Sequence, residues 1–453
     1  MKMMDMKTEI ISRKCIKPSS PTPPHLKTFK LSLLDQITPD LHNNMTFFFS
    51  ASQSGDHNHN HTISQFTTKS QLLQKYLSDI LTLFYPFAGR FQDDTTVLCN
   101  DDGISFVETR TDITLSDFLR HPDLSSVDHH LVPTYDPKTA EELTSMSEGC
   151  MVLIKFVSFS CGGTALSLST SHKLIDLATL ITLLRSWSSA CRGSPDPIIP
   201  DLYTAASLLP PKEIPDTTGS KIIAEKKFAS RRFVFTPSKI EELKSKLFTA
   251  LGYHVSRVEA VTALIWISAA NALKCKTKSF MPTLMVQAVN LRTRMEPPLP
   301  ESSIGNLMWM FSVIVEKEKE MELQELVKKL KGLKKSVNEK VNKFKGEDVV
   351  GLVEESLKER VECLEQRKDN LVVYICSSWC GFPLLETCDF GWGKPAWLTS
   401  IAKNLMTNTV YLMDTKEVGG VEALVHLDEE EMNLFQSNQQ LLQFASVNPD
   451  IVV

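Results

Sequence analysis

The residue pair with the clearest chemical potential is His172 and Asp176, a histidine and a carboxylate four positions apart. An imidazole can accept a proton near neutral pH, so such a histidine can act as a general base. His172 lies where an expected strand over 164–171 gives way to an expected helix from 177. The end of a strand is a usual place for a reactive side chain, although a purely structural histidine is the alternative.

A second unusual run contains Asp389, Gly391 and Gly393, separated by Phe390 and Trp392. Two glycines around a tryptophan indicate a backbone bend that a side chain would obstruct. We therefore expect a packed loop in which Asp389 has a structural role.

The motifs of several common enzyme classes are absent from the sequence. It has no Gly-x-Gly-x-x-Gly or Walker loop, no Gly-x-Ser-x-Gly elbow and no His-Glu-x-x-His helix. The ten cysteines are scattered without a Cys-x-x-Cys pair, which predicts reduced thiols. We therefore expect neither a metal site nor a nucleotide cofactor held by one of these loops.

The composition is that of a globular protein. The chain has 453 residues, of which 42% are hydrophobic and 23% charged, with a formal net charge of -5. This length corresponds to roughly two to three domains, and the charge gives no sign of a nucleic-acid partner. The sequence shows no signal peptide and no long apolar run, which predicts a cytoplasmic protein without a membrane partner.

Hydrophobic periodicity predicts strands and helices on both sides of a proline-rich segment, 193–217, that we interpret as a linker. Ser256 and Glu259 form a capping-box pattern at the start of one helix. The expected strands include 8–16, 152–159, 164–171, 231–235, 283–290, 371–376, 409–413 and 423–427, and the expected helices include 70–84, 237–251, 256–273, 322–345, 347–366 and 428–443.

Two polar stretches have ordinary explanations. The histidine-rich run 56–61 is expected to be a solvated loop rather than a metal site. The lysines between 328 and 345 alternate with apolar residues and glutamates, which favours a solvated helix face over attraction for an anionic ligand.

The His172–Asp176 spacing and the Asp389 run together resemble the two signature motifs of the plant BAHD acyltransferases. The resemblance covers essentially the whole chain. Residues 16–23 are similar to the branch of that family that contains vinorine synthase and deacetylvindoline acetyltransferase. Secondary matches stand in the family's order at 85–90, 256–260, 290–292, 305–306 and 377–380.

The resemblance implies an α+β fold with two similar domains, each a mixed β-sheet with flanking helices, as in chloramphenicol acetyltransferase. The N-terminal domain would span 1–195 and carry His172, a crossover linker would span 196–220, and the C-terminal domain would span 221–453 and carry Asp389. The active-site channel would run between the domains of a monomer, with His172 reachable from both ends.

The resemblance also implies a reaction, because family members transfer an acyl group from a coenzyme A thioester to an alcohol or amine. We expect an acyl-CoA-dependent O-acyltransferase that moves acetyl from acetyl-CoA to a hydroxyl of an alkaloid or terpenoid alcohol. Acyl-CoA would be a co-substrate, with no permanently bound cofactor. A catalytically inactive binding protein of the same fold is the alternative, but the presence of His172 and Trp379 argues against it.

By resemblance, four residues act at the reacting atoms or beside them. His172 would be the general base in a ternary complex with both substrates. The indole N–H of Trp379 and the hydroxyl of Ser377 would donate to the tetrahedral oxyanion. Asn306 would orient His172.

Four further residues would support the site. Asp176 is expected to turn away from the imidazole and pair with Arg292, as a scaffold for the loop. Ser256 and Arg257 are candidates for binding the coenzyme A phosphates, and the alternative is that they only cap and pair on their own helix.

Two residues depart from the family pattern. Leu177 stands where the family usually has glycine, and it either packs beside Leu180 and Ile181, which helical spacing favours, or narrows the acceptor pocket. Gly381 stands where the branch often has arginine, so it leaves room or removes a charge.

Overall fold

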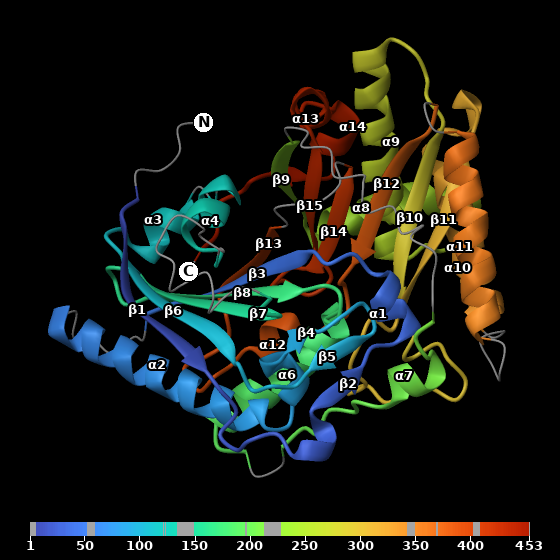
Figure 1. Ribbon diagram of the computed structural model, residues 1–453. Helices are drawn as coiled ribbons and strands as arrows, with labels where there is room; N and C mark the ends of the chain where they lie inside the picture. The colour runs from blue at the N-terminus through green and yellow to red at the C-terminus, as the bar shows by residue number, and fades with distance from the viewer. Residues whose placement is uncertain are drawn as a thin grey trace.

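Two large mixed β-sheets and one small sheet organise the chain (Figure 1). The computed structural model describes residues 6–51, 59–120, 122, 124–133, 149–194, 197–212, 228–341, 349–367, 370–401 and 408–452. Both large sheets carry flanking helices, so the expected α+β class is confirmed. The small sheet joins β2 (Thr28–Lys30), β4 (Arg90–Phe91) and β5 (Thr96–Leu98).

The first large sheet is built mainly from the N-terminal half in the order β1-β6-β7-β8-β3-β13. Its strands are antiparallel except for the parallel pair of β6 and β7. The strands are β1 (Thr8–Ile16), β3 (His42–Phe49), β6 (Ile104–Thr111), β7 (Val152–Ser158), β8 (Thr164–Ser171) and β13 (Trp397–Ile401).

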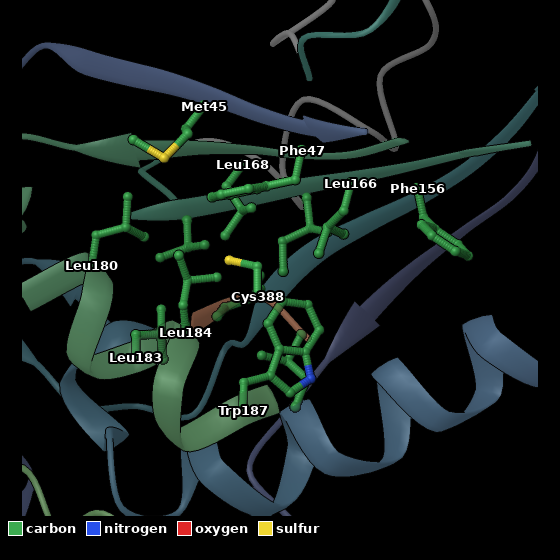
Figure 2. Close-up of a cluster of buried hydrophobic side chains, with 14 of the residues drawn as sticks. Met45, Phe47, Phe156, Leu166, Leu168, Leu180, Leu183, Leu184, Trp187 and Cys388 are labelled. Carbon is green, nitrogen blue, oxygen red and sulfur yellow. The ribbon is translucent and has the colours of Figure 1, made fainter. Parts of the chain in front are cut away.

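One face of this sheet packs on α6 (Leu177–Cys191), next to α2 (His59–Leu81). Side chains that point to the same face alternate along a strand, and Phe47 lies opposite Leu166 in the register of β3 and β8. Figure 2 shows Leu180, Leu184 and Trp187 of α6 below these strand residues. The Trp187 indole N–H also donates to a carbonyl of α2, at 2.9 Å. This packing fixes α6, and therefore its first turn, against the sheet.

The second large sheet has the order β11-β10-β12-β14-β15-β9-β16. Its strands are β9 (Phe228–Phe235), β10 (Thr283–Asn290), β11 (Met308–Val315), β12 (Val372–Ser378), β14 (Thr409–Asp414), β15 (Val421–Asp428) and β16 (Ser446–Val447). The helices around it include α8 (Pro237–Leu251), α9 (Arg257–Thr277), α10 (Leu323–Val341) and α11 (Val349–Gln366).

Helix α9 is long and apolar enough to cross a membrane by length and composition. Its side chains are mostly buried, however, and they form the centre of the hydrophobic cluster of the second sheet. A helix that is apolar around most of its circumference is typical of such a core position. The expected capping box is present, because Ser256 and Glu259 each accept from the other's backbone N–H.

The sheets do not stop at the expected domain boundary. β13 comes from the C-terminal part of the chain but pairs with β3 of the first sheet. Trp397 of β13 donates its indole N–H to Glu422, and Glu422 is ion-paired with Arg232 at 2.9 Å. These three buried side chains connect the first sheet to the second. The division into domains at 1–195 and 221–453 stays a prediction, but strand pairing crosses it.

Three other expectations need adjustment. The segment expected as a linker contains a short helix, α7 (Thr204–Leu208), and its residues 213–220 lie outside the described part of the chain. The last helix, expected over 428–443, is two helices, α13 (Glu429–Phe435) and α14 (Gln439–Leu442), because the Asn438 side chain caps a new start by accepting the Leu441 N–H. In the histidine-rich run, 59–61 begin α2, and 56–58 are not among the described residues.

Candidate active site

A cavity of about 260 Å³ lies between the two large sheets and includes His172 in its wall. Strands β3, β8 and β13 contribute from the first sheet, and β10, β11, β12 and β14 contribute from the second. Much of the wall is apolar, with Leu180, Met308 and Trp309 among its side chains. The cavity therefore exists only because the two sheets face each other.

His172 directly follows β8 and is held by its main chain. Its N–H donates to the Leu41 carbonyl at 2.6 Å, and its carbonyl accepts from the Asn306 side-chain amide, also at 2.6 Å. No described residue bonds to the ring, and its Nδ1 is buried without a hydrogen-bond partner. The backbone thus places the imidazole in the cavity wall, and no described side chain competes for a ring nitrogen.

Asn306 reaches His172, but not by the ring contact that an orienting residue usually makes. Its amide nitrogen binds the His172 carbonyl, and its own backbone N–H donates to Asp35 at 2.6 Å. An effect of Asn306 on the imidazole must therefore pass through the backbone of His172. The orienting role stays a prediction with this contact as its support.

Asp176 points away from the imidazole and into a buried ion pair with Arg292. The two guanidinium nitrogens lie 2.7 and 3.1 Å from the two carboxylate oxygens. Asp176 also caps α6 by accepting the Thr179 N–H at 2.8 Å, and it accepts the Leu307 N–H at 3.2 Å. Arg292 donates further to the Ser303 carbonyl at 2.8 Å. The geometry matches the expected scaffold, since both charges are buried and satisfied.

Trp379 and Ser377 line the same cavity as His172. The Trp379 indole N–H donates to Ser377 Oγ at 3.1 Å, so it does not point freely at a substrate. The Ser377 hydroxyl, which accepts this bond, still has its own hydrogen to donate. The pair therefore offers one direct donor, Ser377, supported by Trp379, instead of the two independent donors expected.

A second cavity, of about 670 Å³, includes Ser256 in its wall together with Arg185, Arg294 and Lys334. Sequence reasoning did not single out Arg294, and Lys334 belongs to the lysine-rich helix that we interpreted as a solvated face. The run of lysines on α10 was the one sequence feature that could have indicated a role for Lys334 in this cavity. His172 lines only the first cavity, so the lining does not show it reachable from both ends.

The two cavities lie on opposite faces of β12. Ile375 and Ser377 line the first cavity, whereas Cys376 and Ser378 line the second. This follows from the alternation of side chains along a strand. Ala288 of β10 lines both cavities, so their walls meet beside it.

Arg257, the second expected phosphate ligand, lies apart from Ser256. Its guanidinium is ion-paired with Asp414 at 2.5 Å and donates to the Gly420 carbonyl at 3.2 Å. Arg257 lines a third cavity, of about 500 Å³, together with Lys394 and Lys416. Ser256 and Arg257 therefore face different cavities. For Arg257 the ion pair fits the alternative that it only pairs with a neighbouring residue and does not bind a phosphate.

The two departures from the family pattern both lie at cavities. Leu177 is half-buried and lines the His172 cavity with Leu180, whereas Ile181 lines the second cavity. The favoured expectation, packing beside both of these residues, has support, because Leu177 packs against the hydrophobic cluster that contains them. Leu177 also lines the cavity, so the pocket alternative has support as well. Gly381 lines the second and third cavities, has a φ of +89° and donates its N–H to Asp414 at 2.7 Å.

The Asp389 loop lies at the far end of α6 from His172. Asp389 Oδ1 accepts the N–H groups of Gly391 and Gly393, at 2.9 and 3.1 Å, and its carbonyl accepts from Arg192 just after the helix. The helix has 15 residues and is therefore about 22 Å long. The loop is thus remote from His172, as expected, and its structural role stays a prediction that these bonds support.

The glycines of this loop are required for a different reason than expected. A Cβ on Gly393 would meet no atom within 4 Å, and one on Gly391 would only reach Arg192 at 4.0 Å. Their φ angles are +106° for Gly391 and +101° for Gly393, which side chains disfavour. Backbone conformation, not lack of space, selects glycine here. No cluster of metal ligands occurs among the described residues.

We predict that Asp389→Ala lowers the midpoint of thermal unfolding together with activity, because two solvent-exposed backbone N–H groups lose an acceptor worth about 0.5–1.5 kcal/mol each. Asp389→Asn is the matched control, since its side-chain oxygen can still accept both bonds, and it should recover most of the stability. Differential scanning fluorimetry and turnover are measured on the same samples. Full stability of the alanine variant with a selective loss of turnover would contradict the structural role.

Comparisons with known proteins agree with this geometry. A profile described as Transferase family matches residues 6–442. The chain is 36% identical to epi-neemfruitin B 7-O-acetyltransferase of Melia azedarach, over 98% of this chain and 99% of that one. It is 32% identical to stemmadenine O-acetyltransferase of Catharanthus roseus, over 95% and 96%.

The crystal structure of vinorine synthase superposes with a TM-score of 0.81 at 31% identity, covering 97% of this chain and 99% of that one. The fold expected from the two motifs is therefore confirmed over nearly the whole chain. With the family profile, these similarities show that the protein is an acyltransferase that belongs to the BAHD family.

Proposed function

We propose that the protein transfers acetyl from acetyl-CoA to a hydroxyl group of a plant specialised metabolite, an alkaloid or terpenoid alcohol. The observation that carries the proposal is the imidazole of His172, which no described residue engages, in the wall of a cavity between the two sheets. The names of the two relatives above, both O-acetyltransferases, support acetyl as the group transferred.

The proposed reaction is a direct transfer in a ternary complex. The acceptor oxygen attacks the thioester carbonyl carbon while His172 takes the hydroxyl proton, which is worth about 10²–10⁴-fold in rate. The tetrahedral oxyanion receives a hydrogen bond from the Ser377 hydroxyl, which the Trp379 indole supports. Collapse breaks the carbon–sulfur bond, and the imidazolium returns the proton to the departing thiolate. No acyl-enzyme is formed.

Charge in the second cavity supports a place for the coenzyme A phosphates. Arg185, Arg294 and Lys334 line this cavity together with two carboxylates, Glu259 and Glu301, and Ser256 caps the N-terminus of α9 at its wall. A helix N-terminus and cations together favour a phosphate group. The pantetheine arm would pass beside Ala288, where the two walls meet, to bring the thioester to His172.

The walls of the first cavity support an apolar acceptor. Ile175, Leu177, Leu180, Met308 and Trp309 surround the space beside His172. An apolar ring system is favoured there by burial of its surface, at about 25 cal/mol per Å². The hydroxyl to be acetylated would then be the polar group that faces the imidazole.

We further propose that a single chain in the cytosol carries out the reaction. Support for a single chain comes from His172 and Ser377, which come from different sheets of the same chain and line one cavity. The described cysteines are free thiols, as is usual in a reducing compartment.

The central test is turnover of acetyl-CoA with a panel of alkaloid and terpenoid alcohols, followed by mass spectrometry. We expect a product heavier by one acetyl group with the wild-type protein. His172→Ala should lower the rate by at least about 10²-fold, since it removes the proton acceptor. Its thermal midpoint and its binding of coenzyme A should be unchanged. If His172→Ala retained more than about a tenth of the wild-type rate, the assignment of His172 as the general base would be wrong.

Leu177→Gly should change acceptor preference, because it widens the cavity next to His172. We expect the ratio of rates for large over small acceptors to rise. Leu177 is half-buried, so the stability loss should be smaller than the ~2–5 kcal/mol of a buried leucine truncation. Ile181→Ala, one turn along α6 and lining the second cavity, is the control and should leave the ratio unchanged. Equal ratios in wild type and Leu177→Gly would show that Leu177 does not shape the acceptor site.

A further inference from the structure

We propose that Asp35 is a positioning residue for His172 and acts through Asn306; the proposal rests on the function of His172 as the base. Asp35 lies in α1 (Leu33–Ile37) and is only 1% exposed. Its Oδ1 accepts the Asn306 backbone N–H at 2.6 Å and the Asn306 side-chain amide at 3.3 Å. That same amide nitrogen donates to the His172 carbonyl at 2.6 Å.

The contacts determine which way the Asn306 amide is turned. Its nitrogen lies between two acceptors, the Asp35 carboxylate and the His172 carbonyl, and an NH₂ group can donate to both. Turning the amide over would set its oxygen against both acceptors. In the observed orientation the Asn306 oxygen is buried with no hydrogen-bond partner among the described residues. The observed orientation therefore keeps the bond to the His172 carbonyl, although it leaves the Asn306 side-chain oxygen without a hydrogen bond.

Asp35 also belongs to a helix cap, and the two roles use different oxygens. Its Oδ2 accepts the Ser32 N–H at 2.8 Å and the Ser32 hydroxyl at 2.6 Å, which completes a capping box on α1. Among the described residues, only Asn306 donates hydrogen bonds to its Oδ1. A variant of Ser32 can therefore disturb the cap while the link to Asn306 stays intact.

Burial of Asp35 exceeds what a helix cap needs. The carboxylate forms no ion pair in the described part of the chain, and burial raises its pKa to about 6. Capping boxes work at exposed helix ends, as Ser256 and Glu259 do here. Gly305, at a φ of +122°, brings the chain beside Asp35, where a Cβ would lie 3.2 Å from the carboxylate. The 303–307 segment is thus packed closely against Asp35.

Asp35 cannot touch a substrate, because it does not line the His172 cavity. It acts instead on a backbone that is held from two sides. The Leu41 carbonyl accepts the His172 N–H, and Asn306 holds the His172 carbonyl. Because no described residue holds the ring, its position depends on these backbone contacts. A small displacement of a reacting group is enough to reduce a rate strongly.

The test compares Asp35→Asn, Asn306→Ala and the control Ser32→Ala in the acetylation assay. Asp35→Asn keeps the shape but removes the negative charge, so the bonds that Asn306 donates lose their charged acceptor whichever way the new amide is turned. We expect kcat to fall by about tenfold or more with both KM values nearly unchanged, as for a misplaced base. The double variant should lose no more kcat than Asn306→Ala alone, since the two residues act in one chain of contacts. Ser32→Ala should lower the thermal midpoint and leave kcat unchanged.

A second readout does not depend on turnover. In protein labelled with ¹³C on histidine rings, the His172 signal is assigned by its loss in His172→Ala. We expect Asp35→Asn and Asn306→Ala to shift this signal and Ser32→Ala to leave it in place. If Asp35→Asn fails to fold, Asn306→Ala tests the same link from the other end.

The outcomes separate this proposal from the proposed function. If the wild-type protein turned over no acceptor, the proposed function would be wrong. The ¹³C signal of His172 would then still show whether Asp35 positions this residue. An unshifted signal in folded Asp35→Asn or Asn306→Ala overturns the proposal. An unchanged kcat in Asp35→Asn, or equal kcat losses in Asp35→Asn and Ser32→Ala, overturns it as well.

Discussion

The buried ion pair between Asp176 and Arg292 is the interaction on which the rest of the site depends. It ties the first turn of α6, four residues after His172, to the chain that follows β10 of the second sheet. Two charges taken out of water are tolerated only when each satisfies the other and their remaining hydrogen bonds are made. The four-residue spacing of the motif is thus the length of the turn from the end of β8 to the cap of α6.

With this turn fixed, the cavity follows from the way the sheets face each other. The strand β13 crosses from the C-terminal part of the chain to pair with β3, and the buried Arg232–Glu422 pair connects it to the second sheet through Trp397. Substrate-facing groups therefore come from both halves: His172 from the first sheet and Ser377 from the second. Neither sheet alone supplies both the proposed base and the proposed oxyanion donor.

Local patterns in the sequence predicted the local structure well. β1 and β8 span the expected residues 8–16 and 164–171, and α8 spans the expected 237–251, because alternation and helical periodicity are properties of short segments. The pairing of Asp176 with Arg292 was predicted too, but through the resemblance to a family and not from a local pattern. Pairing of β13 with β3 was not, since no local pattern encodes a partner more than 340 residues away.

The site contains two further features that sequence reasoning missed. The Ser32-x-x-Asp35 spacing is typical of a helix start, but burial of Asp35 against Asn306 is a long-range contact without a local signal. The bond from Trp379 to Ser377 joins residues only two positions apart, but it depends on the turn after β12, which the sequence pattern did not reveal.

The most direct test of the account is the initial-rate pattern when acetyl-CoA and the acceptor are varied together. If both substrates meet at His172 in one cavity, double-reciprocal lines intersect, as for a ternary complex. Parallel lines, with acetyl-enzyme trapped in the absence of acceptor, would show a covalent intermediate and contradict direct transfer.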